Sequence, residues 1–369
     1  MKYIPGLLFF SLFITILIIT NNFLADQFAL FLDLKNIGQL RLISWTITAF
    51  MLFGLPMSVN SKSRIGQVVY LTSTTLLGFM MYLSLSFLLL NLIQLVIETP
   101  PFYAGLAALS VAVLTTVYGI WNAFNIRLTE LTIPIEALKK DLKAVHLTDI
   151  HLGHVRGKAF LQKVIDKTNA QSPDVVFVTG DLFDGKINLS QETLTPFAAL
   201  KAPVFFIEGN HDNSSGVKII KDYLRNLGVH VLDNQVAQWN ELQIIGLNHM
   251  SADGSKRSVH TAGRFQTIKS VLPTLNIDTK KPTILLHHSP DGIKYAAEQG
   301  VDLYLTGHTH AGQLFPATLF AARMFEYNRG LHEYENTKIL VSEGIGTFGP
   351  PMRVATKSEI ISIILKAKA

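Results

Sequence analysis

The chain contains no cysteine among its 369 residues. This absence excludes disulfide bonds, catalysis by a thiolate and zinc sites ligated by cysteine. It does not identify the compartment, because a protein without cysteine is as stable in oxidising as in reducing surroundings. Any metal ion in this protein must therefore be bound by histidine, carboxylate or amide side chains.

Charged residues are scarce in the first third of the chain. Residues 1–126 hold 5 Lys or Arg and 3 Asp or Glu, whereas residues 127–369 hold 27 and 24. All 12 histidines lie at or beyond His146. We therefore expect a transmembrane helical region over residues 1–126 and a separate domain over residues 127–369, which is long enough for a single well-packed core. The nearly neutral second part argues against nucleic acid as a partner.

Four stretches without any charge predict membrane-spanning helices. Each reaches the roughly 20 apolar residues that a spanning helix requires. The first could instead be a signal peptide, although its best cleavage site, after Ala25, lacks the small-x-small pattern. The four stretches are residues 3–25, 42–61, 65–97 and 99–126.

The basic residues of the short loops predict the orientation in the membrane. With the N-terminus inside, the inner segments carry Lys2, Lys62 and Arg64, and the segment after the last span is also basic. The outer segments carry only Lys35 and Arg41. Because Lys and Arg accumulate in cytoplasmic loops, the second domain is expected in the cytoplasm.

The second part of the chain alternates apolar strand-like runs with segments of helical periodicity. This alternation is typical of α/β layers, and strand pairs without an intervening helix suggest two sheets packed face to face. Predicted strands include residues 127–135, 143–148, 175–178, 203–208, 229–232, 242–247, 283–286, 302–305, 339–342 and 360–365. Predicted helices cover residues 157–170, 191–200, 217–227, 265–272 and 291–299.

Five of the predicted strands end in side chains that can bind a metal ion. In each case an apolar run stops at a small or polar residue, and His, Asp or Asn follows. Open α/β sheets place their ligand sites outside the carboxyl ends of the strands, so these side chains are expected to converge. In chain order they are Asp149 and His151, Asp181, Asn210 and His211, His287 and His288, and His308 and His310.

The donor atoms of these side chains indicate the metal and the chemistry. Carboxylate, imidazole and amide groups suit Mn, Fe, Zn or Co rather than soft copper. They are too numerous for one tetrahedral ion, whereas a two-metal site, typical of phosphate ester hydrolysis, accommodates them. Any one motif alone is more often packing or surface chemistry, but five in this context favour a metal site. Other histidines, such as His146 and His249, are expected to be structural or exposed.

The order of the motifs resembles that of the calcineurin-like metallophosphoesterase superfamily. The motifs are Asp-x-His, Gly-Asp, Gly-Asn-His-Asp, His-x-Pro-Asp and Gly-His-Thr-His, within about residues 142–365. Residues 307–313 and 342–347 are similar to the membrane-anchored bacterial subfamily. The resemblance implies a four-layer αββα sandwich, two divalent metal ions and a location in the bacterial inner membrane.

The resemblance also implies a role for each candidate ligand. His288 is preferred to His287 because the ligand of the family precedes x-Pro-Asp, although His287 could compete with it. Ala311 stands where the family commonly has glycine. Asp149, His151 and His310 would hold the first metal ion, Asn210, His288 and His308 the second, and Asp181 would bridge both.

Two residues beside the ligands are candidates for proton transfer. His211 is expected to contact the phosphate and protonate the leaving oxygen, because its side chain diverges from that of Asn210. Asp212 could orient that imidazole or cap the helix that follows, and both roles stay open. Asp184 is interpreted as a turn former, and Arg156 as a contact to either phosphate or solvent.

The sequence thus predicts a membrane-anchored phosphoesterase that hydrolyses phosphate ester or pyrophosphate bonds. Its partners would be a phosphorylated substrate and membrane lipids, and only the membrane anchor favours a lipid-linked substrate. A non-catalytic metal-binding sensor or channel subunit is the alternative from a different class. A nuclease is disfavoured by the nearly neutral charge of the second domain.

Overall fold

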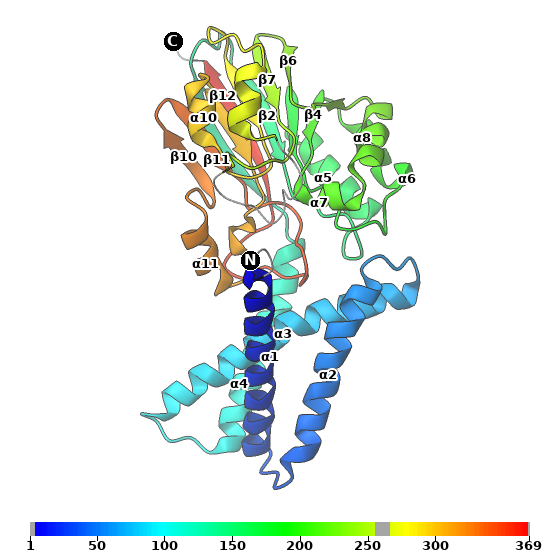
Figure 1. The fold of residues 1–369 in the computed structure, drawn as a ribbon, viewed down its shortest axis with the longest axis vertical. Coiled ribbons are helices and arrows are strands. Elements are labelled where there is room, and N and C mark those ends of the chain that lie inside the picture. Colours follow the sequence, from blue (N-terminus) through cyan, green and yellow to red (C-terminus); the bar gives the residue numbers. More distant parts are fainter. Residues whose placement is uncertain (1–3, 255–265, 368–369) are drawn as a thin grey trace. The chain divides into compact units, whose positions relative to one another are not determined.

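The computed structural model describes residues 4–254 and 266–367 (Figure 1). The chain divides into two compact units, each of which is described separately. The helical unit comprises Met1–Ile120 and Gly349–Met352, and the α/β unit comprises Trp121–Phe348 and Arg353–Ala369.

Four long helices account for most of the helical unit, and all four are long and apolar enough to cross a membrane. The N-caps of α2 and α3 are Asn36 and Ser63, whose side chains accept hydrogen bonds from the first turn and so fix where each helix begins. The last turn of α4 belongs to the α/β unit. The helices are α1 (Ile4–Phe31), α2 (Ile37–Ser58), α3 (Arg64–Gln94) and α4 (Pro101–Phe124).

Two six-stranded sheets form the centre of the α/β unit. The first has the order β1 (Arg127–Ile135), β12 (Glu359–Ala367), β2 (Leu142–Leu147), β3 (Val175–Thr179), β4 (Val204–Ile207) and β5 (His230–Val231). The second has the order β10 (Gly330–Tyr334), β11 (Thr337–Val341), β9 (Leu303–Thr306), β8 (Thr283–Leu286), β7 (Leu242–Gly246) and β6 (Gln235–Trp239).

Short helices connect these strands. The α-helices are α5 (Lys158–Asn169), α6 (Gln191–Leu194), α7 (Asn210–Ser215), α8 (Val217–Asn226), α9 (Ile268–Val271), α10 (Ile293–Glu298) and α11 (Ala317–Met324). The 3₁₀ turns are η1 (Thr195–Ala199), η3 (Leu272–Thr274) and η4 (His310–Gly312).

Three hydrophobic cores separate four layers. In β3, Val176 and Val178 pack into a core shared with α5, whereas Val175 and Phe177 pack into a core shared with the second sheet. The outer face of the second sheet packs on α9 and α10 in a third core. Because β3 is buried on both faces, its sequence is a continuous apolar run rather than an alternating one. The predicted αββα sandwich is confirmed.

Some elements differ from the sequence prediction. Strands β6 and β10 were not expected, because their side chains are half-buried or exposed and make no apolar run. Helix α11 was also missed. The helix predicted at residues 265–272 begins outside the described residues, and its described part consists of α9 and η3.

Leu305 in β9 lies in the core between the sheets, and Leu331 in β10 is 41% exposed. We expect Leu305→Ala to lower the free energy of unfolding by about 3 kcal/mol, because it leaves a cavity in a close-packed core. Leu331→Ala makes the same chemical change at the surface and should alter it by less than about 0.5 kcal/mol. Urea unfolding of detergent-solubilised protein, followed by tryptophan fluorescence, measures both. Equal losses would contradict the placement of Leu305.

Candidate metal centre

The candidate ligands follow strands that run in the same direction within each sheet. In the first sheet, β2, β3 and β4 are parallel neighbours, and Asp149, Asp181 and Asn210 come directly after them. In the second, β8 and β9 are parallel, and His288 and His308 follow them. Carboxyl ends of parallel strands meet at one edge of a sheet, so the two sheets present their ligands together.

Five of these residues have backbone angles in the left-handed region. The φ angles are 52° at Asp149, 51° at His151, 51° at Asp181, 72° at His308 and 47° at His310. This conformation costs a residue with a side chain roughly 1–2 kcal/mol. Hydrogen bonds between neighbouring loops hold it, such as His151 N–H to the Asp181 carbonyl at 3.0 Å. Strain of this kind clusters at functional sites, where it aims side chains inward.

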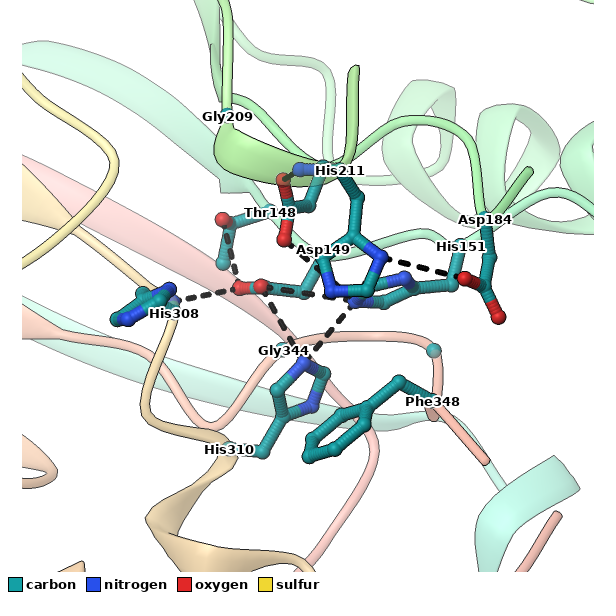
Figure 2. Close-up of polar contacts among 12 residues, drawn as sticks. Thr148, Asp149, His151, Asp184, Gly209, His211, His308, His310, Gly344 and Phe348 are labelled. Atoms are coloured by element: carbon teal, nitrogen blue, oxygen red, sulfur yellow. Dashed lines mark hydrogen bonds and ion pairs between the residues drawn. The ribbon is translucent and has the colours of Figure 1, made fainter. Parts of the chain in front are cut away.

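The first group of ligand atoms belongs to Asp149, His151 and His310. All three atoms lie within 4.8 Å of one another (Figure 2). The Nε2 atoms of the two histidines are 3.1 Å apart, and Asp149 Oδ1 is 3.3 Å from His310 Nε2. The three side chains are almost fully buried, so they are fixed around one point.

The second group consists of Asp181, His288 and His308, again within 4.8 Å of one another. Asp181 Oδ2 lies 3.1 Å from His288 Nε2, and His288 Nε2 lies 3.2 Å from His308 Nδ1. On the far side of the ring, His288 Nδ1 lies 2.8 Å from the carbonyl of Thr179. A hydrogen bond there fixes the tautomer in which Nε2 carries a lone pair, as a metal ligand requires.

Asp149 and Asn210 each present a buried oxygen atom that is suitable for a metal ion. Asp149 Oδ2 accepts hydrogen bonds from the Thr148 hydroxyl (2.8 Å) and the His308 N–H (3.1 Å). Asp149 Oδ1 is buried and has no hydrogen-bond partner among the described residues, and the same holds for Asn210 Oδ1. Buried oxygens of this kind are rare unless they face a ligand. The donor set therefore fits a divalent metal ion.

The electrostatics of the site favour positive charge beside the two carboxylates. Burial by itself would raise the pKa of Asp181, but His288, His211 and His151 hold that pKa well below its usual range. Burial lowers the pKa of His288, yet Asp181 and Asp149 outweigh it and raise the pKa to about 9, so a metal ion bound at Nε2 would displace a proton from that nitrogen. Two buried carboxylates thus need positive charge between them.

Two histidines of the site, His308 and His310, are neutral. Burial lowers the pKa of His308 to about 3 and that of His310 to about 4. Neutral imidazole is the form in which histidine binds a metal ion. Behind His310, the buried guanidinium of Arg353 lies 3.0 Å from Nδ1 and donates to the carbonyls of Glu343 and Gly346.

The imidazole of His211 contacts Asp184 rather than Asp212. His211 Nδ1 lies 3.2 Å from Asp184 Oδ1, and the ring packs edge-on against His151 (Figure 2). Asp212 instead accepts hydrogen bonds from the N–H groups of Leu182, Phe183 and Gly209. Of the two roles left open for Asp212, its contacts favour capping, because its buried carboxylate accepts from the N-cap residue Gly209 of α7 and from two further backbone donors, whereas Asp184 contacts the imidazole.

The contact between Asp184 and His211 was not predicted, although the position of Asp184 in the sequence gave a signal for it. It lies three residues after Asp181, within reach of the same strand end, but the adjacent Gly185 favoured a turn. Burial lowers the pKa of His211, but the hydrogen bond with Asp184 and the charges of Asp181 and Asp184 outweigh it and raise the pKa to about 9. His211 is therefore protonated near neutral pH.

The structure also shows the surroundings of Arg156, which was expected to contact phosphate or solvent, and of His249. Arg156 meets neither substrate nor solvent, because it is fully buried between the rings of Phe124 and Phe160 and donates to the Ala123 carbonyl. His249, which was expected to be structural or exposed, lies beside the candidate ligands. It is buried, and its ring centroid lies 5.6 Å from that of His288. It follows β7, the neighbour of β8, so the strand-end pattern applied to it as well.

His287 does not compete with His288 as a ligand. Its Nδ1 lies 2.8 Å from the Ser289 carbonyl, and its Nε2 accepts a hydrogen bond from the Met250 N–H at 3.4 Å. Both ring nitrogens thus face backbone groups.

An aromatic ring borders the first group of ligands. Phe348 is 44% exposed, and its centroid lies 5.0 Å from that of His310 (Figure 2). The side-chain amide of Gln313 fixes this residue by donating to the Phe348 carbonyl and accepting from its N–H. The ring therefore forms a rigid apolar border beside the polar site.

Fold and site together define an α/β sandwich with histidine and carboxylate metal ligands at strand ends. The family model of calcineurin-like phosphoesterases matches residues 142–312. An uncharacterized metallophosphoesterase of Aquifex aeolicus is 34% identical over 266 residues, which cover 70% of this chain and 98% of the relative. The chain belongs to the calcineurin-like metallophosphoesterase family.

Other relatives are longer or more distant. A transmembrane protein with a metallophosphoesterase domain from Danio rerio is 34% identical over 278 residues, which cover 70% of this chain. The chain spans only 62% of the length of that relative. The phosphodiesterase YaeI of Escherichia coli is 28% identical over 220 residues, which cover 56% of this chain and 75% of the relative.

Gly307 approaches Asp149 so closely that a Cβ atom would collide with Asp149 Oδ2 and Thr148 Oγ1. We expect Gly307→Ala to weaken metal affinity about tenfold or more, since it displaces a ligand. Among the described residues, no atom lies within 4 Å of the corresponding position at Gly254, so Gly254→Ala should leave affinity unchanged. Elemental analysis after dialysis against graded Mn²⁺ measures both. Unchanged metal content in Gly307→Ala would contradict the ligand role of Asp149.

Proposed function

We propose that this protein hydrolyses phosphate esters at a binuclear centre of divalent metal ions. The observation that carries the proposal is the position of Asp181 between the two ligand groups. Its Oδ2 atom lies 3.1 Å from His288 Nε2 in the second group and 3.9 Å from His151 Nε2 in the first. A carboxylate in that position can be shared by two ions.

The proposed ligand set follows the two groups. The first ion would be held by Asp149, His151 and His310, the second by Asn210, His288 and His308, and Asp181 would bridge them. Ions bound there would polarise the phosphoryl oxygens and make a water molecule nucleophilic near neutral pH. Mn, Fe and Zn suit these donors.

His211 is the proposed general acid. Its Nδ1 atom faces Asp184, which accepts the Nδ1–H and keeps the ring positively charged. The second proton, on Nε2, can then pass to the leaving oxygen. The main-chain N–H of His211 donates to Asp181 Oδ1 at 2.8 Å, which ties the acid to the ligands. Asp212 is proposed to support this loop by capping it rather than to transfer protons.

The chain is membrane-associated through its four long apolar helices. We propose that the α/β unit faces the cytoplasm of a bacterial cell from the inner membrane, in keeping with the basic residues of the inner loops. A phosphodiester is the proposed substrate, because a relative is named a phosphodiesterase. The membrane location favours a lipid-linked phosphate among such esters.

His211→Ala should lower kcat for bis-p-nitrophenyl phosphate by about 100-fold or more with Mn²⁺, because general acid catalysis is lost. Its metal content should stay unchanged. Asp181→Asn should lose both activity and metal. The difference in metal content between the two variants distinguishes the general acid from the bridging ligand. Steady-state kinetics and elemental analysis of the full-length protein measure these effects. A metal-loaded wild type that hydrolysed no phosphate ester or pyrophosphate would favour the sensor or channel alternative.

The pH dependence tests the pair of His211 and Asp184. The acid must be protonated, so activity falls as the pH rises through the pKa of His211, which lies near 9. Asp184→Asn removes a charge that raises this pKa, so the alkaline limb of the pH–rate profile should move down by about one unit. Asp222→Asn, an exposed site in α8, is the matched control. An alkaline limb that does not move would contradict the pairing.

A further inference from the structure

Helix α11 and the residue before its N-cap expose large apolar side chains. The exposed fractions are 45% at Phe315, 63% at Leu319, 71% at Phe320 and 75% at Met324. On the opposite side, Ala321 is buried and anchors the helix. We name the four exposed side chains the α11 apolar patch. In contrast, the described strands of the α/β unit expose large apolar side chains only one at a time, such as Leu331 on β10.

The α11 apolar patch is connected to the end of the last spanning helix. Within the α/β unit, the Asn122 side chain in the last turn of α4 donates to the Arg353 and Thr356 carbonyls, at 3.0 and 2.9 Å. The intervening Val354 accepts a hydrogen bond from the Phe315 N–H at 3.1 Å. One short segment therefore bonds to α4 on one side and to the start of α11 on the other.

The end of α4 has the features of a membrane boundary. Trp121 is 58% exposed there, and tryptophan is enriched where spanning helices leave the apolar layer. Arg127 follows at the start of β1, and basic side chains are favourable next to anionic headgroups. The hydrogen-bonded connection keeps α11 close to this boundary.

The α11 apolar patch is also connected to the metal centre. Helix α11 begins shortly after His310, which opens the 3₁₀ turn η4. At its other end, the Phe325 ring packs edge-on against His308, with centroids 5.9 Å apart. A ligand from each of the two groups thus borders this helix.

We propose that the α11 apolar patch inserts into the lipid bilayer at headgroup depth and holds the metal centre at the level of lipid phosphates. An exposed Arg323 on the same helix can meet those phosphates. Apolar side chains together with an exposed basic residue on one short helix are the pattern of an amphipathic helix that lies in the interface of a membrane, with its apolar face at the boundary of headgroups and acyl chains.

Spin labels on the full-length protein test this insertion without any activity measurement. Because the chain has no cysteine, Leu319→Cys, Phe320→Cys and Ile219→Cys each accept a single label. Ile219, 47% exposed on α8, is the control. In nanodiscs of phosphatidylcholine and phosphatidylglycerol, the labels on α11 should collide with oxygen more and with a water-soluble nickel chelate less than the Ile219 label. Metal content confirms that each variant is folded.

Two results would overturn the proposal. Labels at Leu319 and Phe320 with the same nickel accessibility as the Ile219 label would show that α11 faces water. Labels shielded from both oxygen and nickel would show that protein covers the patch, either the helical unit or a second copy.

A second experiment measures kinetics and depends on the proposed function. Leu319→Gln with Phe320→Gln should raise KM about tenfold for a chromogenic phospholipid in phosphatidylcholine vesicles. The same variant should hydrolyse soluble bis-p-nitrophenyl phosphate like wild type. Equal KM values for the vesicle substrate would count against the insertion. If no variant hydrolyses any ester, the proposed function fails, whereas the labelling result stands alone.

Discussion

The burial of two carboxylates, Asp149 and Asp181, is the constraint on which the site depends. Removing such groups from water costs several kcal/mol each unless positive charge and hydrogen bonds compensate. Here imidazoles and backbone N–H groups surround them, and Gly307 and Gly209 allow the chain to approach closely. The left-handed backbone of the ligand loops follows from the same need to aim every donor at one small volume.

The surroundings of the metal centre keep this arrangement rigid. Arg156 is held between Phe124 and Phe160 and donates to Ala123 and to the Thr347 hydroxyl. It therefore connects the last turn of α4 to the loop between β11 and β12, which contains Phe348. Burial lowers its pKa to about 9, so the guanidinium stays charged at neutral pH. The last turn of α4 is thus packed as a part of the α/β unit.

Much of the site could be predicted because strand ends have a local signature. An apolar run followed by Gly-Asp or Gly-His marks both the strand and the side chain after it, as at Asp181 and His308. Roles that depend on contacts between loops could not be predicted in this way. The sequence left two roles open for Asp212, orienting His211 or capping a helix, and did not by itself show that the loop after β3 brings Asp184 to the imidazole.

The sequence by itself determined the four apolar helices, the α/β class and the set of candidate metal ligands, because each depends on composition or on short local patterns. Tertiary structure alone decided which side chains meet. It buried Arg156, brought His249 beside His288, and left Leu319 and Phe320 exposed on α11. The physical reason is that burial and pairing arise from packing between segments distant in the chain, on which local patterns carry no information.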